Sequence, residues 1–187
     1  MVRYTNHSKG VNSEGVDDMD DMILQDLARQ AGIALEQEEL LLATAESCTG
    51  GWLGQVITSI AGSSAWYERG FITYAAGSKQ EMLGVSDATL EQYGAVSEQT
   101  ASEMAAGAIA RSHAQVAVSI TGIAGPEGGT PEKPVGTVCF AWIMKEGMAL
   151  TETRYFSGNR EEIRRQSVGG ALQGIIDLLH SIPPKVA

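Results

Sequence analysis

The chain has 187 residues, a length that supports one domain with a buried core and excludes two large ones. Its hydrophobic fraction of 43% and charged fraction of 19% are typical of a globular protein and exclude a fibrous or wholly disordered chain. With 13 basic and 23 acidic residues the formal net charge is -10, which gives no general attraction for a nucleic-acid backbone. We therefore expect no nucleic-acid partner.

Membrane, disulfide and metal chemistry also find little support in the sequence. No stretch approaches the roughly 20 uninterrupted apolar residues that cross a bilayer, and the first residues lack the apolar block of a signal peptide. The two cysteines, Cys48 and Cys139, cannot form a disulfide framework and have no zinc-ligand spacing, and the three histidines lie far apart. These features predict a cytosolic protein with no membrane association and no metal site.

The N-terminal part of the chain predicts a leader, a helix, a strand and a second helix. Residues 1–18 are polar and lack periodicity, so we expect a flexible leader before a domain that spans residues 19–182. A first helix is predicted by apolar residues at helical spacing, namely Met22, Ile23, Leu27, Ala28, Ala31 and Leu35. The short apolar run 39–45 favours a buried strand, and a glycine break separates it from a second helix. That helix is predicted by Trp52, Leu53, Val56, Ile57 and Ile60.

The middle of the chain continues this alternation of strands and helices. Residues 70–79 predict a second strand that runs into a glycine turn, and two short helical pieces follow at 79–85 and 87–94. Ser97 is expected to cap a longer periodic helix. Residues 115–121 are short and apolar, which predicts a third, buried strand.

The last third of the chain predicts a loop, a hairpin and a helix. Residues 122–136 contain five glycines and three prolines, which exclude regular structure and indicate a long shaped loop. The β-rich runs 137–144 and 149–156 predict a hairpin, and a long helix begins near Asn159 and ends before Pro183. The predicted fold class is therefore α/β, a three-layer α/β/α sandwich with a mixed β-sheet.

The break at residues 44–51 is the first candidate site. The first N–H groups of a helix lack internal partners and lie at the positive end of its dipole, so they bind an anion or a developing oxyanion. Gly50 and Gly51 allow a substrate to approach that backbone. Ser47 then either attacks a substrate or only caps the helix, and these two interpretations stay open. Cys48 is a weaker candidate nucleophile, because no histidine partner is apparent.

A serine nucleophile needs a base, and the scarcity of histidine favours a lysine with a lowered pKa. Lys79 follows the predicted turn after the second strand and lies near Tyr74 in the sequence. In this hypothesis Lys79 accepts the serine proton and Tyr74 relays a proton or holds the lysine. The alternative is that Lys79 is a solvated residue at the start of a short helix and Tyr74 an ordinary strand residue.

Two further segments are candidates for binding a substrate. Gly122 and Gly125 form another wall of the site if their strand runs parallel to the first, although shaped glycine loops are also common as plain turns. Near the start of the last helix, Arg164 and Arg165 form a basic cluster with Arg160 that suits a phosphate. The same arginines also fit a solvated helix face paired with glutamates.

Five stretches in chain order carry a resemblance to a known family. They are TAESCTGG, AGSSAWYERGFITY, GAVSEQTASEMAAGA, SITGIAGPEGGTPEKPVGTV and IRRQSV. Together they resemble the CinA C-terminal family, and within it the chain is similar to the stand-alone nicotinamide-nucleotide amidohydrolases. The similarity extends from Ile23 to Leu179, and several matching stretches in order are far more specific than one short motif.

The resemblance implies hydrolysis of the carboxamide of nicotinamide mononucleotide (NMN) to nicotinate mononucleotide and ammonia in pyridine-nucleotide recycling, with no cofactor. It carries the family's serine onto Ser47, its lysine onto Lys79 and its tyrosine onto Tyr74. Ser47 would attack the amide carbon and Lys79 would move the proton to the leaving ammonia. The oxyanion would be held by backbone N–H groups of Thr49, Gly50 and Gly51.

Two alternative functions stay open. One is a non-catalytic nucleotide-binding or protein-interaction module linked to competence or DNA damage. The other is a hydrolase of a different amide or ester, because the sequence indicates the nucleophile better than the substrate. We also expect a homo-oligomer, since the apolar hairpin and the terminal helix offer surfaces to bury.

Overall fold

The computed structural model describes the backbone of residues 13–145 and 147–182, and the side chains within those ranges from residue 20 onward. In chain order its elements are α1 (Ser13–Glu38), β1 (Leu42–Glu46), α2 (Trp52–Thr58), the 3-10 helix η1 (Ser63–Ala65), β2 (Tyr67–Ile72), α3 (Ala76–Leu83), α4 (Asp87–Tyr93), α5 (Glu98–Ala110), β3 (Val116–Gly122), β4 (Thr137–Met144), β5 (Ala149–Tyr155) and α6 (Arg160–His180).

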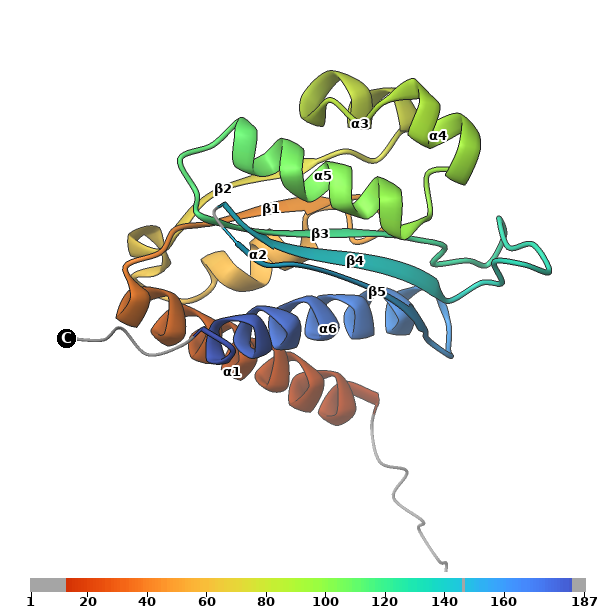
Figure 1. Cartoon of the computed structure of the whole chain (residues 1–187). Coiled ribbons are helices and arrows are strands. Elements are labelled where there is room, and N and C mark those ends of the chain that lie inside the picture. Colours follow the sequence, from red (N-terminus) through yellow and green to blue (C-terminus); the bar gives the residue numbers. More distant parts are fainter. Residues whose placement is uncertain (1–12, 146, 183–187) are drawn as a thin grey trace, which may run out of the picture.

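The strands form one five-stranded sheet in the order β2-β1-β3-β4-β5 (Figure 1). β1 runs parallel to both of its neighbours, β2 and β3. β4 is antiparallel to β3, and β5 is antiparallel to β4. All residues of the interior strand β1 are buried, whereas most of the edge strand β5 is exposed. The prediction of a mixed sheet is confirmed.

Helices cover both faces of the sheet, so the three-layer arrangement is also confirmed (Figure 1). α1, α2 and α6 lie against one face, where their apolar side chains share a core with β1, β3 and β4. α5 covers the other face, with α3 and α4 beside it, and its core is rich in alanine. Small side chains on that face allow α5 to approach the strands closely.

The parallel strands end together at one edge of the sheet. Glu46, the last residue of β1, is level with Ile72 in β2 and Ile120 in β3. Chain segments that leave the carboxyl ends of neighbouring parallel strands meet outside that edge, where ligands bind in open α/β sheets. The candidate residues after β1, β2 and β3 therefore converge in space although they are far apart in the sequence.

The structure corrects two expectations for the N-terminal helix. α1 begins at Ser13, so residues 13–18 of the predicted flexible leader are helical, and the rest of that leader lies outside the described residues. The predicted stripe also began wrongly, because Met22 and Ile23 are exposed. The buried stripe is Leu24, Ala28, Ala31 and Leu35.

Most of the remaining elements agree with the sequence. Ser97 caps α5 by accepting a hydrogen bond from the backbone N–H of Thr100. Asn159 and Glu162 form a reciprocal capping box at the start of α6. The hairpin of β4 and β5 is present as predicted. The predicted strand at 70–79 is displaced, because β2 ends at Ile72 and α3 already begins at Ala76.

Candidate active site

Ser47 and Lys79 form a direct hydrogen bond at the carboxyl edge of the sheet. Ser47 follows β1 without a gap, and its backbone N–H continues the sheet by donating to the carbonyl of Ile120 at 2.9 Å. The Nζ of Lys79 lies 2.9 Å from the Oγ of Ser47. Both side chains are buried, with exposed fractions of 7% for Ser47 and 1% for Lys79. A hydroxyl next to an amine in this geometry is suited to proton transfer from the hydroxyl.

The sequence had suggested that Lys79 follows a turn at the end of a strand. In the structure it lies inside α3. Because it is buried, the alternative of a solvated lysine is wrong. Its Nζ also donates to the carbonyl of Thr73 at 2.7 Å, and no ion pair with Lys79 occurs within the described residues. Burial lowers the pKa of Lys79, since the ammonium loses its hydration. Burial therefore shifts Lys79 toward the neutral amine, the form that accepts a proton.

Ser47 is not a helix cap, so that alternative for it is also wrong. The N-cap of α2 is Gly51, which has a left-handed φ of 98° and carries no side-chain cap. Gly50 is left-handed as well, with φ 61°, so the two glycines allow a turn that L side chains rarely adopt. The chain therefore makes a tight loop between Ser47 and α2, and the serine hydroxyl is left to Lys79.

The N-terminus of α2 is capped by the carboxylate of Glu46, which is 2% exposed. Its Oε2 accepts from the hydroxyl of Thr49 at 2.7 Å and from the N–H of Gly51 at 3.0 Å and of Leu53 at 3.1 Å. Its Oε1 accepts from the N–H of Gly54 at 2.9 Å. The positive end of this helix therefore faces an internal anion.

These contacts change which N–H groups are available to a substrate. The N–H of Gly51 is engaged by Glu46, and that of Gly50 donates to the carbonyl of Ser47 at 3.0 Å. Within the described part of the chain, the N–H of Thr49 makes no hydrogen bond. Of the three predicted oxyanion donors, Thr49 is thus the one whose backbone N–H is free.

Arg164, on α6, donates hydrogen bonds to the Ser47–Gly51 turn. Its Nε donates to the carbonyl of Cys48 at 3.1 Å and its Nη2 to the carbonyl of Thr49 at 2.8 Å. In a trans peptide the C=O and N–H point in opposite directions, so the contact with Cys48 turns the Thr49 N–H away from the arginine. Arg165 has no such contact with the turn in the described residues, and its guanidinium pairs with Asp21 and with Glu161.

Tyr74 lies at the rim and is 61% exposed. Its hydroxyl accepts a hydrogen bond from Nη2 of Arg160 at 2.8 Å, and in the described residues no hydrogen bond joins it to Ser47 or Lys79. Arg160 also donates from Nη1 to the carbonyl of Gly125 at 2.8 Å. Arg160 thereby ties the loop after β3 to the rim.

The two predicted loop glycines have structural reasons to be glycine. Gly122 ends β3, where a Cβ would lie 2.8 Å from Cγ2 of Val138. Gly125 has a left-handed φ of 75°, and a Cβ there would lie 2.5 Å from Cγ1 of Val135. Only Gly125 is joined to the rim, through its carbonyl and Arg160.

A hollow of about 480 Å³ lies at the rim and is lined by Trp52, Arg160, Glu161 and Arg164. The guanidinium of Arg164 lies 5.1 Å from the centre of the Trp52 ring, as does that of Arg165. This stacking fixes the indole and helps to order the arginines. The hollow is thus flanked by positive charge, with the carboxylate of Glu161 already paired to Arg165.

Cys48 is an unsuitable nucleophile in this structure. The side chain is 6% exposed, and burial raises the pKa of its thiol to about 12. The thiol is therefore protonated at neutral pH, and the thiolate is the nucleophilic form. Cys139 lies in β4, is also buried and has a pKa raised by burial, in agreement with its prediction as a core residue.

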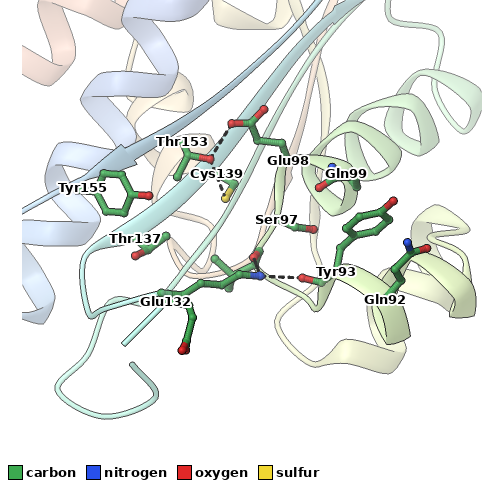
Figure 2. Close-up of a pocket in the computed structure, with 12 residues that line it drawn as sticks. Gln92, Tyr93, Ser97, Glu98, Gln99, Glu132, Thr137, Cys139, Thr153 and Tyr155 are labelled. Atoms are coloured by element: carbon green, nitrogen blue, oxygen red, sulfur yellow. Dashed lines mark hydrogen bonds between the residues drawn. The ribbon is translucent and has the colours of Figure 1, made fainter. Parts of the chain in front are cut away.

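A second hollow of about 430 Å³ lies between the start of α5 and the β4–β5 hairpin, as Figure 2 shows. Several of its polar groups have partners inside the protein. Lys133 donates to the carbonyls of Tyr93 and Val96, both at 2.7 Å. Glu98 accepts from the hydroxyl of Thr153 at 2.7 Å. These contacts secure the loop and the hairpin, and no serine–base pair lines this hollow.

The described residues offer neither a metal-binding cluster nor a membrane-spanning helix. They contain no group of three or more histidine, cysteine, aspartate or glutamate side chains arranged to hold a metal ion. Among the same residues, no helix has the length and apolarity that crossing a membrane requires.

Sequence reasoning missed the roles of Glu46 and of the Thr73 carbonyl. A glutamate at the end of a buried strand, directly before a glycine turn and a helix, could have indicated the role of Glu46, because a buried carboxylate needs hydrogen-bond donors nearby. Arg160 was noted only as part of a basic cluster, yet it is the arginine that contacts Tyr74. The carbonyl of Thr73 has no signature in the sequence.

Comparisons with known proteins agree over nearly the whole described chain. The family model of the CinA C-terminal domain matches residues 24–179. Nicotinamide-nucleotide amidohydrolase PncC of Escherichia coli (strain K12) is 54% identical over 155 residues, which cover 83% of this chain and 94% of that protein. The protein of the same name from Pseudomonas putida is 45% identical over 152 residues, covering 81% and 94%. The crystal structure of the competence/damage inducible protein CihA from Agrobacterium tumefaciens has a TM-score of 0.81 and 48% sequence identity, and covers 83% of this chain and 95% of that one.

Proposed function

The chain belongs to the CinA C-terminal domain family, and we propose that it hydrolyses NMN to nicotinate mononucleotide and ammonia. Relatives that are 54% and 45% identical over most of the chain are named nicotinamide-nucleotide amidohydrolases. The observation that carries the proposal is the buried hydrogen bond of 2.9 Å between Lys79 and Ser47. A family relationship alone does not identify a nucleophile. In this pair Ser47 is the candidate nucleophile and Lys79 its candidate base.

In the first half of the proposed reaction the amide is exchanged for an ester. The neutral Nζ of Lys79 takes the proton of the Ser47 hydroxyl while the Oγ forms a bond to the carboxamide carbon. The C=O electrons move onto oxygen and give a tetrahedral oxyanion. When this intermediate collapses, the C–N bond breaks and the Lys79 ammonium gives its proton to the leaving nitrogen. Ammonia departs and an acyl-enzyme ester on Ser47 is left.

The second half uses water and returns the enzyme to its starting state. Lys79, again neutral, takes a proton from a water whose oxygen attacks the ester carbon. Collapse of the second oxyanion breaks the bond to Oγ of Ser47, which regains a proton from Lys79. The product leaves as the carboxylic acid, which loses its proton to the solvent and becomes the carboxylate of nicotinate mononucleotide. The lowered pKa that burial gives Lys79 suits both halves, because each begins with a neutral amine.

Three sets of residues are proposed to hold the substrate. The free N–H of Thr49 points at the developing oxyanion, supported by its lack of an internal acceptor in the described chain. Arg160 and Arg164 bind the phosphate, supported by their position beside the hollow of about 480 Å³. Arg165 already pairs with two carboxylates and is therefore not part of the proposed phosphate contact. Tyr74, held by Arg160, orients the substrate at the rim.

The decisive experiment incubates the protein with NMN and measures both ammonia and nicotinate mononucleotide. Ser47→Ala and Lys79→Ala are assayed beside the wild type, with no metal added. Product from the wild type and none from either variant supports the amidohydrolase. Wild-type protein that binds NMN and releases no product would instead support the non-catalytic nucleotide-binding module, and turnover of other amides only would support a different hydrolase. The homo-oligomer, the cytosolic location and the absence of a nucleic-acid partner stay predictions.

A further inference from the structure

The carboxylate of Glu46 connects the nucleophile turn to the helix that follows it. Four donors converge on its two oxygens, at distances of 2.7 to 3.1 Å. They comprise the hydroxyl of Thr49 and the N–H groups of Gly51, Leu53 and Gly54. The residue is almost wholly buried, so these donors replace the water that an exposed carboxylate would have.

The backbone of Glu46 is connected to the lysine side of the site. Its carbonyl accepts from the N–H of Thr73 at 2.7 Å, which keeps the chain after β2 beside the end of β1. The carbonyl of Thr73 in turn accepts from Nζ of Lys79 at 2.7 Å. Through its side chain Glu46 thus fixes the turn that carries Ser47, and through its main chain it fixes the acceptor that orients Lys79.

We propose that Glu46 is a positioning residue for the amidohydrolase reaction, an inference that rests on the proposed function. It touches no reacting atom. Its carboxylate keeps the Ser47–Gly51 turn in the one shape that aligns the serine hydroxyl with Lys79 and leaves the Thr49 N–H free for the oxyanion. Gly51, the N-cap of α2, has no side chain that could take over this task.

A glutamine at position 46 would fill the same volume and lose the positioning function. Both carboxylate oxygens face donors, whereas an amide offers one acceptor oxygen and one NH₂ group. Either orientation of the amide therefore sets an N–H against a backbone N–H, and the turn must shift to relieve the contact. A misplacement of about 1 Å in a catalytic constellation costs about a hundredfold in rate.

The test compares Glu46→Gln with Glu103→Gln, a matched variant in another helix cap. Glu103 on α5 accepts from the N–H of Ser86 at 2.7 Å and from the hydroxyl of Thr89, so it holds the start of α4 as Glu46 holds α2. For both variants and the wild type, one measures kcat and KM with NMN, the Tm, and the rate at which a fluorophosphonate labels Ser47.

We expect kcat of Glu46→Gln to fall about a hundredfold with KM changed less than about threefold, and labelling of Ser47 to slow in parallel. Glu103→Gln should lose a comparable amount of Tm and keep its kcat within about threefold. Equal kcat in Glu46→Gln and the wild type would overturn the inference, and so would a loss of kcat in Glu103→Gln as large as in Glu46→Gln.

A second variant covers the case in which Glu46→Gln does not fold. Thr49→Val keeps the shape of the side chain and removes one of the four donors to Glu46, so kcat should fall about tenfold with KM nearly unchanged. Unchanged kcat in this variant would count against the positioning role. If the wild type itself does not hydrolyse NMN, the proposed function fails, and the labelling rates alone then decide whether Glu46 aligns Ser47.

Discussion

The Nζ of Lys79 lies 2.9 Å from the Oγ of Ser47, although 32 positions separate the two residues in the chain. Parallel pairing of β1 with β2 brings the ends of these strands together, and α3 then turns the chain back over the end of β1. The pair is therefore a product of the topology and not of local sequence. Because Lys79 is buried without a carboxylate partner in the described chain, its presence needs a reason other than stability.

Replacing Lys79 by methionine should separate activity from stability. Methionine keeps most of the volume and removes the amine that takes the serine proton, so kcat should fall at least about a thousandfold. The same change removes a buried ionisable group, so the Tm should stay level or rise. Steady-state assays with NMN and thermal unfolding followed by circular dichroism check both parts. Retained turnover, or unfolding of the variant at room temperature, would contradict this assignment of Lys79.

The rate should depend on the protonation of Lys79. Burial lowers the pKa of Lys79 from its ordinary value of 10.5, and the neutral amine is the active form. We expect kcat/KM to rise with pH through that lowered pKa and then to level off. A pH–rate profile of the wild type checks this expectation. A profile that keeps rising until the ordinary pKa of a lysine would show that burial does not tune the base.

The free energy of unfolding should also depend on the protonation of Lys79. The unfolded chain has the ordinary lysine pKa of 10.5 and holds the proton where the folded protein has already lost it. The free energy of unfolding therefore rises with pH from the lowered pKa up to the ordinary one, and below the lowered pKa the full cost of the buried charge is present. The Lys79→Met variant buries no ammonium and so does not have this cost. Its stability advantage over the wild type should shrink as pH rises, which urea unfolding between about pH 6 and 10 would detect.

The layers and most elements of this fold could be predicted from the sequence because each buried element carries its own pattern. The first four residues of β1 are apolar or small and a glycine-rich turn follows the strand, and the buried stripe of α6 recurs over about five turns. The sequence predicted the position of the junction between β2 and α3 less accurately. Gly77 suggested a turn there but lies inside α3, where a glycine is tolerated at a modest cost.

Site residues could be predicted from the sequence where the residue type has few other roles in such a position. A serine before a glycine pair suggested Ser47, and the scarcity of histidine directed attention to Lys79. Glu46 escaped notice because its value depends on four donors that approach it only in the folded turn. Gly51 was expected to offer its N–H to a substrate, yet Glu46 engages that N–H, which no property of the glycine itself reveals.

Cys48 should prove dispensable for turnover. Its thiol has a pKa raised to about 12 by burial, so below that pH the thiolate is scarce. Cys48→Ala should keep kcat within a few-fold of the wild type and lose about 1 kcal/mol of stability from the missing packing. Iodoacetamide should leave the native enzyme active for the same reason. A variant that folds and has lost its turnover would make Cys48, and not Ser47, the nucleophile to pursue.

Arg160 should matter for the phosphate and much less for the chemical step. Its guanidinium lines the hollow beside Trp52 and is held by contacts with Tyr74 and the carbonyl of Gly125. Removing it should raise KM for NMN about tenfold or more, because a charge-assisted contact to phosphate is lost. A phosphate-free analogue, nicotinamide riboside, should show a much smaller change.

Arg29→Ala is the matched control for this prediction. It removes one positive charge from an exposed position on α1, where among the described residues Arg29 pairs with Asp26 alone, so its KM for NMN should equal that of the wild type. Steady-state kinetics with both substrates then separate a specific phosphate contact from a general effect of net charge. If Arg160→Ala raised KM equally for NMN and the riboside, the arginine would act on the common part of the two molecules, through Tyr74 and the loop at Gly125, and the phosphate would need another partner.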